Sequence, residues 1–219
     1  MKIDKMLSRC LVLLGTSLIL PTLNGCSQQM PYRTAANISY HSTSVQKSSH
    51  KVAGRVDHTM ASLAALIHKP SGKLRAGFDR FSGELSSLKS GCSHLTGAIS
   101  KVTGAQANYM AAWEKHVQGI SNPDIAAAAR GNYHAAQSDF SRFSKRAKTT
   151  ETAGGKLIAY LYNMKKYLAS DLSADGLKGA AKLLGKAKSH AAIFKHDLVK
   201  LEDDSVRLAG DLRPAVGAT

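Results

Sequence analysis

Apolar side chains recur along most of this chain at alternating steps of three and four residues. The longest series runs from Leu74 to Ile120 without a break in its phase. Its members are Leu74, Phe78, Phe81, Leu85, Leu88, Cys92, Leu95, Ile99, Val102, Gln106, Tyr109, Trp113, His116 and Ile120. Steps that average 3.5 residues keep one stripe of a helix apolar, so the series predicts a long helix with a coiled-coil seam.

A second series follows a signal for a helix start. Residues 121–124, Ser-Asn-Pro-Asp, supply an N-cap residue and a proline for the first turn. The seam of this second helix comprises Ala129, Tyr133, Ala136, Phe140, Phe143, Ala147, Thr150, Gly154, Leu157, Leu161, Met164 and Leu168. Its phase is unbroken across residues 148–156, which favours one continuous helix over a break at Gly154 and Gly155.

A third series predicts the last helix. Residues 173–175, Ser-Ala-Asp, supply an N-cap residue for a new helix. Pro214 ends this helix, because proline cannot continue it. The seam comprises Leu177, Ala180, Leu184, Ala187, Ala191, Phe194, Leu198, Leu201, Ser205, Leu208 and Leu212.

The N-terminal part has a weaker pattern. A shorter helix is predicted there from Val52, Val56, Met60, Leu63 and Ile67. It ends before Pro70, because the residue that precedes a proline is pushed out of the helical region. Residues 26–44 have many polar side chains and no apolar period, so they are predicted to be a flexible tether.

These patterns define an all-α fold class. Short connections make consecutive helices antiparallel neighbours. We therefore predict an elongated antiparallel three- to four-helix bundle with coiled-coil heptad seams over residues 45–213, and a tail over 214–219. Folding the chain back about residue 122 places Trp113 opposite the small residues 126–129, and Gly154 near Gly91 and Cys92.

The first 25 residues are typical of an export signal. Three basic residues precede the apolar run 10–20, which is shorter than the 20 or so residues of a membrane span. Residues 23–26, Leu-Asn-Gly-Cys, resemble a bacterial lipobox. The resemblance implies that residues 1–25 are removed and that Cys26 carries the lipid. The alternative is a secreted protein that is cut near residues 34–36.

The lipobox resemblance also implies a location. Ser27, in place of an aspartate after the lipidated cysteine, favours delivery to the outer membrane, on the inner leaflet that faces the periplasm. Two or three acyl chains hold a protein at a membrane far more firmly than one. Because Cys26 is acylated, Cys92 is the one thiol that remains in the mature chain.

The mature chain is strongly basic. Residues 26–219 contain 27 Lys and Arg against 14 Asp and Glu, a net charge of +13, which predicts attraction to anionic surfaces. The candidate anion-binding residues are Arg142, Lys145, Arg146, Lys148, Lys178, Lys182 and Lys186. The alternative is a solvated face that keeps the bundle in solution. Nucleic acid is disfavoured as a partner, since export separates the protein from it and no aromatic residues are interleaved for stacking.

Small residues form a second candidate surface, on the outer face of the helix that begins near Leu74. They are Gly83, Ser86, Ser90, Ser93, Gly97, Ser100 and Gly104. Their spacing is compatible with a groove that accepts a partner helix. The favoured alternative is that the first helix of the chain folds back and covers them.

The segment from about Leu88 to Arg213 resembles a known family. The matching residues are Trp113-Glu114, Tyr133 and the stretch 161–180. They resemble a family of uncharacterised bacterial lipoproteins with a helical domain of unknown function. Where that family has a Leu-Lys-His-Asn-Leu-Asn-like motif, residues 168–173 keep the two leucines and replace Lys, His and the first Asn. The resemblance implies an exported, lipid-anchored helical protein and carries no activity with it.

No residue pattern predicts catalysis. No two of the nine histidines are three or four residues apart, so no helical metal pair and no cofactor are predicted. Cys92 and His116 are interpreted as core or turn-end residues, and no serine has a G-x-S-x-G context. We predict a lipoprotein that is an interaction or scaffold module and not an enzyme, with an anionic-lipid or polymer binder as the alternative. Homo-oligomers stay open, because such seams also pack between chains.

Overall fold

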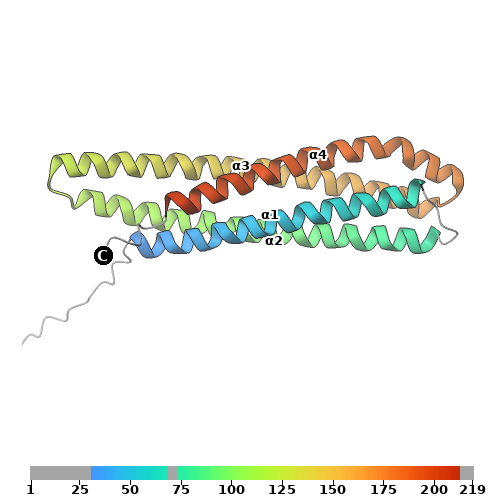
Figure 1. The fold of residues 1–219 in the computed structure, drawn as a ribbon, viewed down its shortest axis with the longest axis horizontal. Coiled ribbons are helices and arrows are strands. Elements are labelled where there is room, and N and C mark those ends of the chain that lie inside the picture. Colours follow the sequence, from blue (N-terminus) through green and yellow to red (C-terminus); the bar gives the residue numbers. More distant parts are fainter. Residues whose placement is uncertain (1–30, 69–73, 213–219) are drawn as a thin grey trace, which may run out of the picture.

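The computed structural model describes residues 31–68 and 74–212, which form four helices. These are α1 (Pro31–His68), α2 (Leu74–Gln118), α3 (Pro123–Ser170) and α4 (Ala174–Asp211). The described residues contain no strand, and the protein is an all-α antiparallel helical bundle (Figure 1). The predicted signal peptide, Cys26 and the tail over 214–219 lie outside the described residues.

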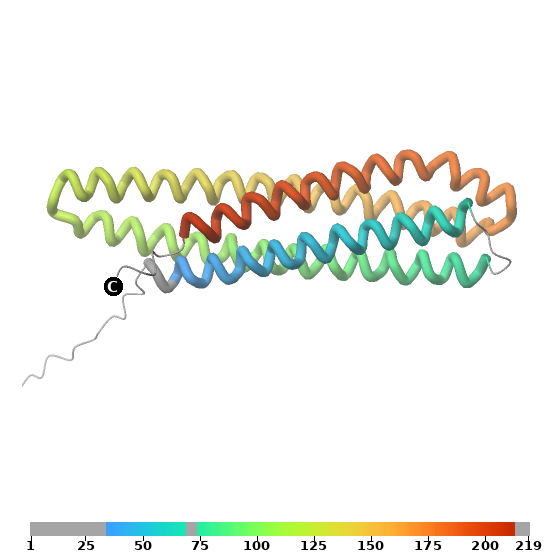
Figure 2. The backbone as a smooth tube through the Cα atoms, viewed as in Figure 1, coloured from blue at the N-terminus to red at the C-terminus, as the bar shows by residue number. Residues whose placement is uncertain are grey.

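The four helices form a closed ring of neighbours. α1 packs against α2 and α4, and α3 packs against the same two helices. The described part of the chain has no packing between helices across the diagonal. α2 and α3 are longer than the other two, at 45 and 48 residues against 38 each. The turn of the α2–α3 hairpin therefore extends past the first residue of α1 and the last residue of α4 (Figure 2).

The predicted seams of α3 and α4 form much of the core. All the seam positions of α4 are buried, and the phenylalanines at 140, 143 and 194 are among the largest fully buried side chains. α3 runs through residues 148–156 without a break, as its phase predicted. Thr150 supports this stretch, because its Oγ1 donates to the carbonyl oxygens of Arg146 (2.9 Å) and Asp197 (3.2 Å).

Two glycines make room for different neighbours. A Cβ atom on Gly154 would lie 2.9 Å from the ring of Phe194, so glycine lets this ring from α4 lie against the α3 backbone. A Cβ atom on Gly91 would lie 2.7 Å from Arg55 Nη1 of α1. Cys92 and Gly154 do border one groove, as predicted, whereas Gly91 faces α1.

The prediction of a tether up to residue 44 is wrong, and so is the start of the bundle at residue 45. α1 begins at Pro31. Its buried seam comprises Ala35, Ile38, Ser42, Val45, Ser49, Val52, Val56, Thr59, Leu63 and Leu66. The steps of three and four are complete, but three positions carry hydroxyl groups and hide the apolar period. One of them, Thr59, takes the seam position that was assigned to Met60.

Ser49 offers a test of this hydroxyl-bearing seam. Its side chain is buried, and its hydroxyl has no hydrogen-bond partner among the described residues. Since a buried unpaired polar group is unfavourable and alanine is the better helix former, we expect Ser49→Ala to raise the free energy of unfolding by about 1 kcal/mol. Urea unfolding followed by circular dichroism measures it. Ser90→Ala, at an exposed position of α2, is the matched control and reports helix propensity alone. Equal effects of the two substitutions would contradict the prediction.

The tip of the α2–α3 hairpin decides between the two interpretations of His116. His116 is exposed in the last turn of α2, so it is a turn-end residue and not a core residue, whereas its neighbour Val117 is buried. The reason is that α2 has only α3 beside it near the tip. The predicted start of α3 is confirmed, because Asn122 Oδ1 accepts from the backbone N–H groups of Asp124 (3.0 Å) and Ile125 (3.1 Å).

Candidate functional site

The two arginines of the predicted anion-binding set face carboxylates of α4. Arg142 Nε lies 3.3 Å from Asp204 Oδ1, and Arg146 Nε lies 3.5 Å from Asp204 Oδ2. Arg146 Nη1 also lies 3.8 Å from Asp197 Oδ1. The two Nε atoms are at ion-pair distance without hydrogen-bond geometry. Arg142 and Arg146 thus pair with carboxylates inside the bundle, and their binding of an external anion stays a prediction.

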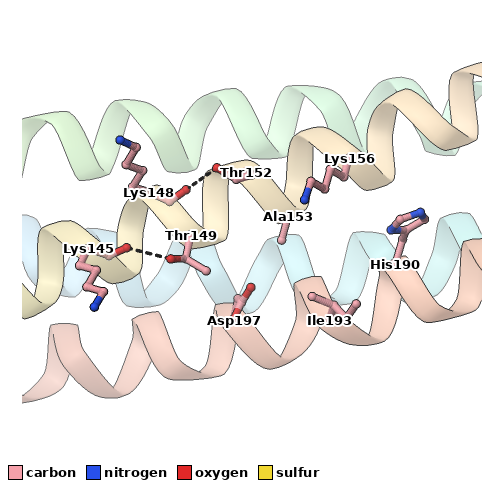
Figure 3. A pocket seen from close by; sticks show the side chains of 9 residues that line it. All are labelled: Lys145, Lys148, Thr149, Thr152, Ala153, Lys156, His190, Ile193 and Asp197. Atoms are coloured by element: carbon pink, nitrogen blue, oxygen red, sulfur yellow. Dashed lines mark hydrogen bonds between the residues drawn. The ribbon is translucent and has the colours of Figure 1, made fainter.

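The lysines of the same stretch border a groove between α3 and α4. The groove has a volume of about 460 Å³. It is lined by Lys145, Lys148, Thr149, Thr152, Ala153, Lys156, His190, Ile193 and Asp197. The side chains of Lys145 and Lys156 extend toward α4, whereas Lys148 extends away from it (Figure 3). We call this surface the basic groove.

The basic groove keeps its positive charge. In the described ranges, lysine ion pairs are made by Lys178 with Asp175 (3.2 Å) and by Lys195 with Asp57 (2.7 Å), and none is made by the three groove lysines. The one carboxylate that lines the groove, Asp197, is buried and faces Arg146. The groove therefore offers unpaired ammonium groups to a ligand.

The threonines of the groove are already engaged as donors. Thr149 Oγ1 donates to the carbonyl oxygen of Lys145 at 3.0 Å, and Thr152 Oγ1 donates to that of Lys148 at 2.8 Å. An anion in the groove would consequently be held by lysine ammonium groups and by His190. Lysine is a flexible point charge, so such a site favours negative charge without demanding one geometry.

The predicted α4 lysines are only partly brought to the groove. Lys186 Nζ lies 5.9 Å from the centroid of the Tyr160 ring, and that ring lies 5.3 Å from the ring of His190, which lines the groove. Lys186 therefore extends the basic surface along α4. Lys182 is exposed, and Lys178 is paired with Asp175 at the start of the helix.

Two of the groove's basic residues, Lys156 and His190, were not predicted from the sequence. A signal for Lys156 was present, because positions 145, 148, 152 and 156 follow one another at steps of three and four beside the seam. No such signal existed for His190, since its place depends on how α4 packs against α3.

The small-residue face of α2 is uncovered. All seven of its members are exposed, and Cβ atoms on Gly83, Gly97 and Gly104 would have no neighbour within 4 Å. The alternative that the first helix covers this face is wrong, because α1 packs on the side of Gly91 instead. Ser93 and Gly97 border a separate groove of about 550 Å³ between α1 and α2.

Cys92 is not placed for thiol chemistry. It is half-buried beside the core, and burial raises the pKa of its thiol to about 11, against a smaller opposing effect of Arg55. The group is thus a neutral thiol near pH 7, whereas the reactive form of cysteine is the thiolate. The described residues contain no cluster of three or more metal-ligating side chains.

The fold and the groove define an all-α bundle with a cationic surface. No helix among the described residues has the length and apolarity that a membrane crossing requires. No protein-family model matches the chain, and neither a curated protein nor a solved structure shows significant similarity to it. The resemblance to a lipoprotein family therefore stays a prediction.

Proposed function

We propose that this protein is a lipid-anchored helical rod of the bacterial envelope that binds a linear anionic polymer in the basic groove. The observation that carries the proposal is a groove over which two lysines, Lys145 and Lys156, extend toward α4 without a carboxylate partner among the described residues. A solvated face would also be basic, but charges that border a recess between two helices can contact one ligand together.

The spacing of the charges supports a polymer over a small anion. Lys145 and Lys156 are eleven residues apart on α3, which corresponds to about 16 Å along the helix axis. Lys186 continues the basic surface beyond His190. A single phosphate or carboxylate cannot reach all of these groups, whereas a chain with repeated negative charges can.

Charge reversal in the groove tests this proposal. We expect the double substitution Lys145→Glu and Lys156→Glu to weaken the binding of polyphosphate, used as a model polyanion, by roughly tenfold or more, about 1.4 kcal/mol or more. Isothermal titration calorimetry at two salt concentrations measures it, and wild-type binding should weaken as salt rises.

The control for this test has the same net charge as the groove variant. Lys47→Glu with Lys115→Glu makes the same change at exposed positions of α1 and α2. The control variant should bind almost as the wild type does. If both variants lose affinity equally, only the overall charge attracts the polymer, and the basic groove is not its site.

The anchor is tested at Cys26. We expect the wild-type chain to incorporate labelled palmitate in a bacterial host and Cys26→Ser to incorporate none. Incorporation by the variant equal to that of the wild type would contradict anchoring at this residue. Membrane fractionation of the labelled protein then tests the proposed location at the outer membrane.

A second candidate function is the docking of a partner helix on the small-residue face of α2. The exposure of all seven of its residues favours this candidate. Packing of small residues against a helix depends little on salt, in contrast to polyanion binding. A photo-reactive group at Ser93 that captures one specific envelope protein, and does so equally at high salt, would support this function over the first.

A further inference from the structure

The tip of the α2–α3 hairpin lies beyond the start of α1. Thr59 Oγ1 of α1 donates to the carbonyl oxygen of Glu84 of α2 at 3.2 Å, which places these residues at one level. Because the two helices are antiparallel, Pro31, 28 residues before Thr59, is level with Ala112, 28 residues after Glu84. α2 continues for six residues past this level, about 9 Å, before the turn (Figure 1).

The proposed lipid lies close to this same end of the bundle. Cys26 is five residues before Pro31, the first residue of α1. Five residues span at most about 18 Å even when they are fully extended. An acylated Cys26 therefore holds the start of α1, and with it the hairpin tip, near the membrane surface.

The tip carries side chains that suit a membrane interface. Ile125 is 59% exposed, and Ile120 is partly buried in the turn before it. Below them, Trp113 and Tyr133 are partly buried and meet edge to face, with ring centroids 6.3 Å apart. This arrangement has apolar residues at the extremity and amphipathic rings behind them, and such rings are enriched where a membrane meets water.

The charge of the tip distinguishes it from the basic groove. Residues 113–133 contain two acidic and two basic side chains, so the tip has no net charge. Attraction to anionic head groups does not explain a contact here. The exposed side chain of Ile125 would instead contribute by leaving water for the acyl region.

We infer that the hairpin tip is a second membrane contact, which inserts into the leaflet that holds the acyl chains of Cys26. This inference rests on the proposed anchor. The two contacts set the rod on the membrane by the end that carries the start of α1 and the tip. The basic groove between α3 and α4 then lies farther along the rod, away from the lipid surface.

The chain contains its own probe for this contact, because Trp113 is its only tryptophan. The full mature protein, purified from a host that acylates lipoproteins, is reconstituted into phosphatidylcholine vesicles. Half of the vesicle samples contain lipids that are brominated on the acyl chains. We expect the brominated lipids to quench Trp113 emission and plain vesicles to shift that emission to shorter wavelength.

Two matched substitutions make the test specific. Ile125→Asp adds a charge at the tip and is expected to abolish the quenching. Val199→Asp adds the same charge on α4, at a position 56% exposed, and is expected to leave the quenching unchanged. Both sites are exposed, so both variants should keep the helical circular dichroism of the wild type. Loss of quenching in both variants, or in neither, would overturn the inference.

Mass spectrometry of the same samples separates this inference from the anchor proposal. An acylated protein without quenching overturns the second contact and leaves the anchor standing. A protein without acyl groups overturns the anchor, and the inference fails with it. An acylated protein that is quenched, with the expected difference between Ile125→Asp and Val199→Asp, supports both.

Discussion

Replacement of Phe194 by alanine is expected to lower the free energy of unfolding by about 3 to 5 kcal/mol. The ring of Phe194 is 1% exposed and lies against the backbone of α3 at Gly154. Removal of the ring leaves a cavity that a glycine on the facing helix cannot fill. Urea unfolding followed by far-UV circular dichroism gives the difference.

The neighbouring residue supplies the control for this prediction. Ile193 is adjacent in sequence but 57% exposed, so Ile193→Ala should change the free energy of unfolding by less than about 0.5 kcal/mol. Addition of Gly154→Leu to the Phe194→Ala variant should recover part of the lost free energy of unfolding, since the two side chains share one space. An unchanged unfolding midpoint in Phe194→Ala would contradict the contact between α3 and α4.

The helices differ in how far their sequences predict them. Every seam position of α4 is buried, and all but Ser205 are apolar. The spacing of apolar residues in the sequence of α4 therefore equals the spacing of its core residues. In α1 the seam is equally regular, but Ser42, Ser49 and Thr59 occupy core positions. A small hydroxyl side chain fits between closely packed helices, although its polarity hides the pattern. Tertiary packing thus extends α1 beyond what its local apolar period indicates.

The basic groove was harder to predict than the fold. The cluster of Arg142, Lys145, Arg146 and Lys148 is visible as a run of positive charge. Which of these side chains stay free depends on Asp204, which is more than fifty residues away in the sequence and meets both arginines in the bundle. An amphipathic period gives the face of a helix that is buried, but it does not give the partner on the next helix.

The ion pairs of Arg142 and Arg146 with α4 also explain why we propose that lysines, and not arginines, bind the polymer. Arginine is the preferred partner of a carboxylate in a partly buried site, because its planar group spreads the charge and offers several donors. α3 uses Arg142 and Arg146 in this way to join α4. Lysines on the same helix keep their charge for solvent or a ligand, so structural and binding roles are divided between the two residue types.

The second large effect is expected from Leu95→Ala, which should lower the free energy of unfolding by about 2 to 5 kcal/mol. Leu95 is 3% exposed and lies near the middle of α2, the helix that packs against both α1 and α3. Loss of this side chain leaves a cavity in the core that α2 shares with the other helices. The same urea titration measures the change.

The number of steps in the urea unfolding of Leu95→Ala tests whether the four helices unfold together. Each described helix packs against two others in a closed ring, so the loss should shift one cooperative transition to lower urea and should not create a second transition. Thr96→Ala, at the exposed position next in the chain, is the control and should leave the midpoint almost unchanged. A separate early transition in Leu95→Ala would mean that the α2–α3 hairpin unfolds by itself, in which case α1 and α4 do not depend on it for their own packing.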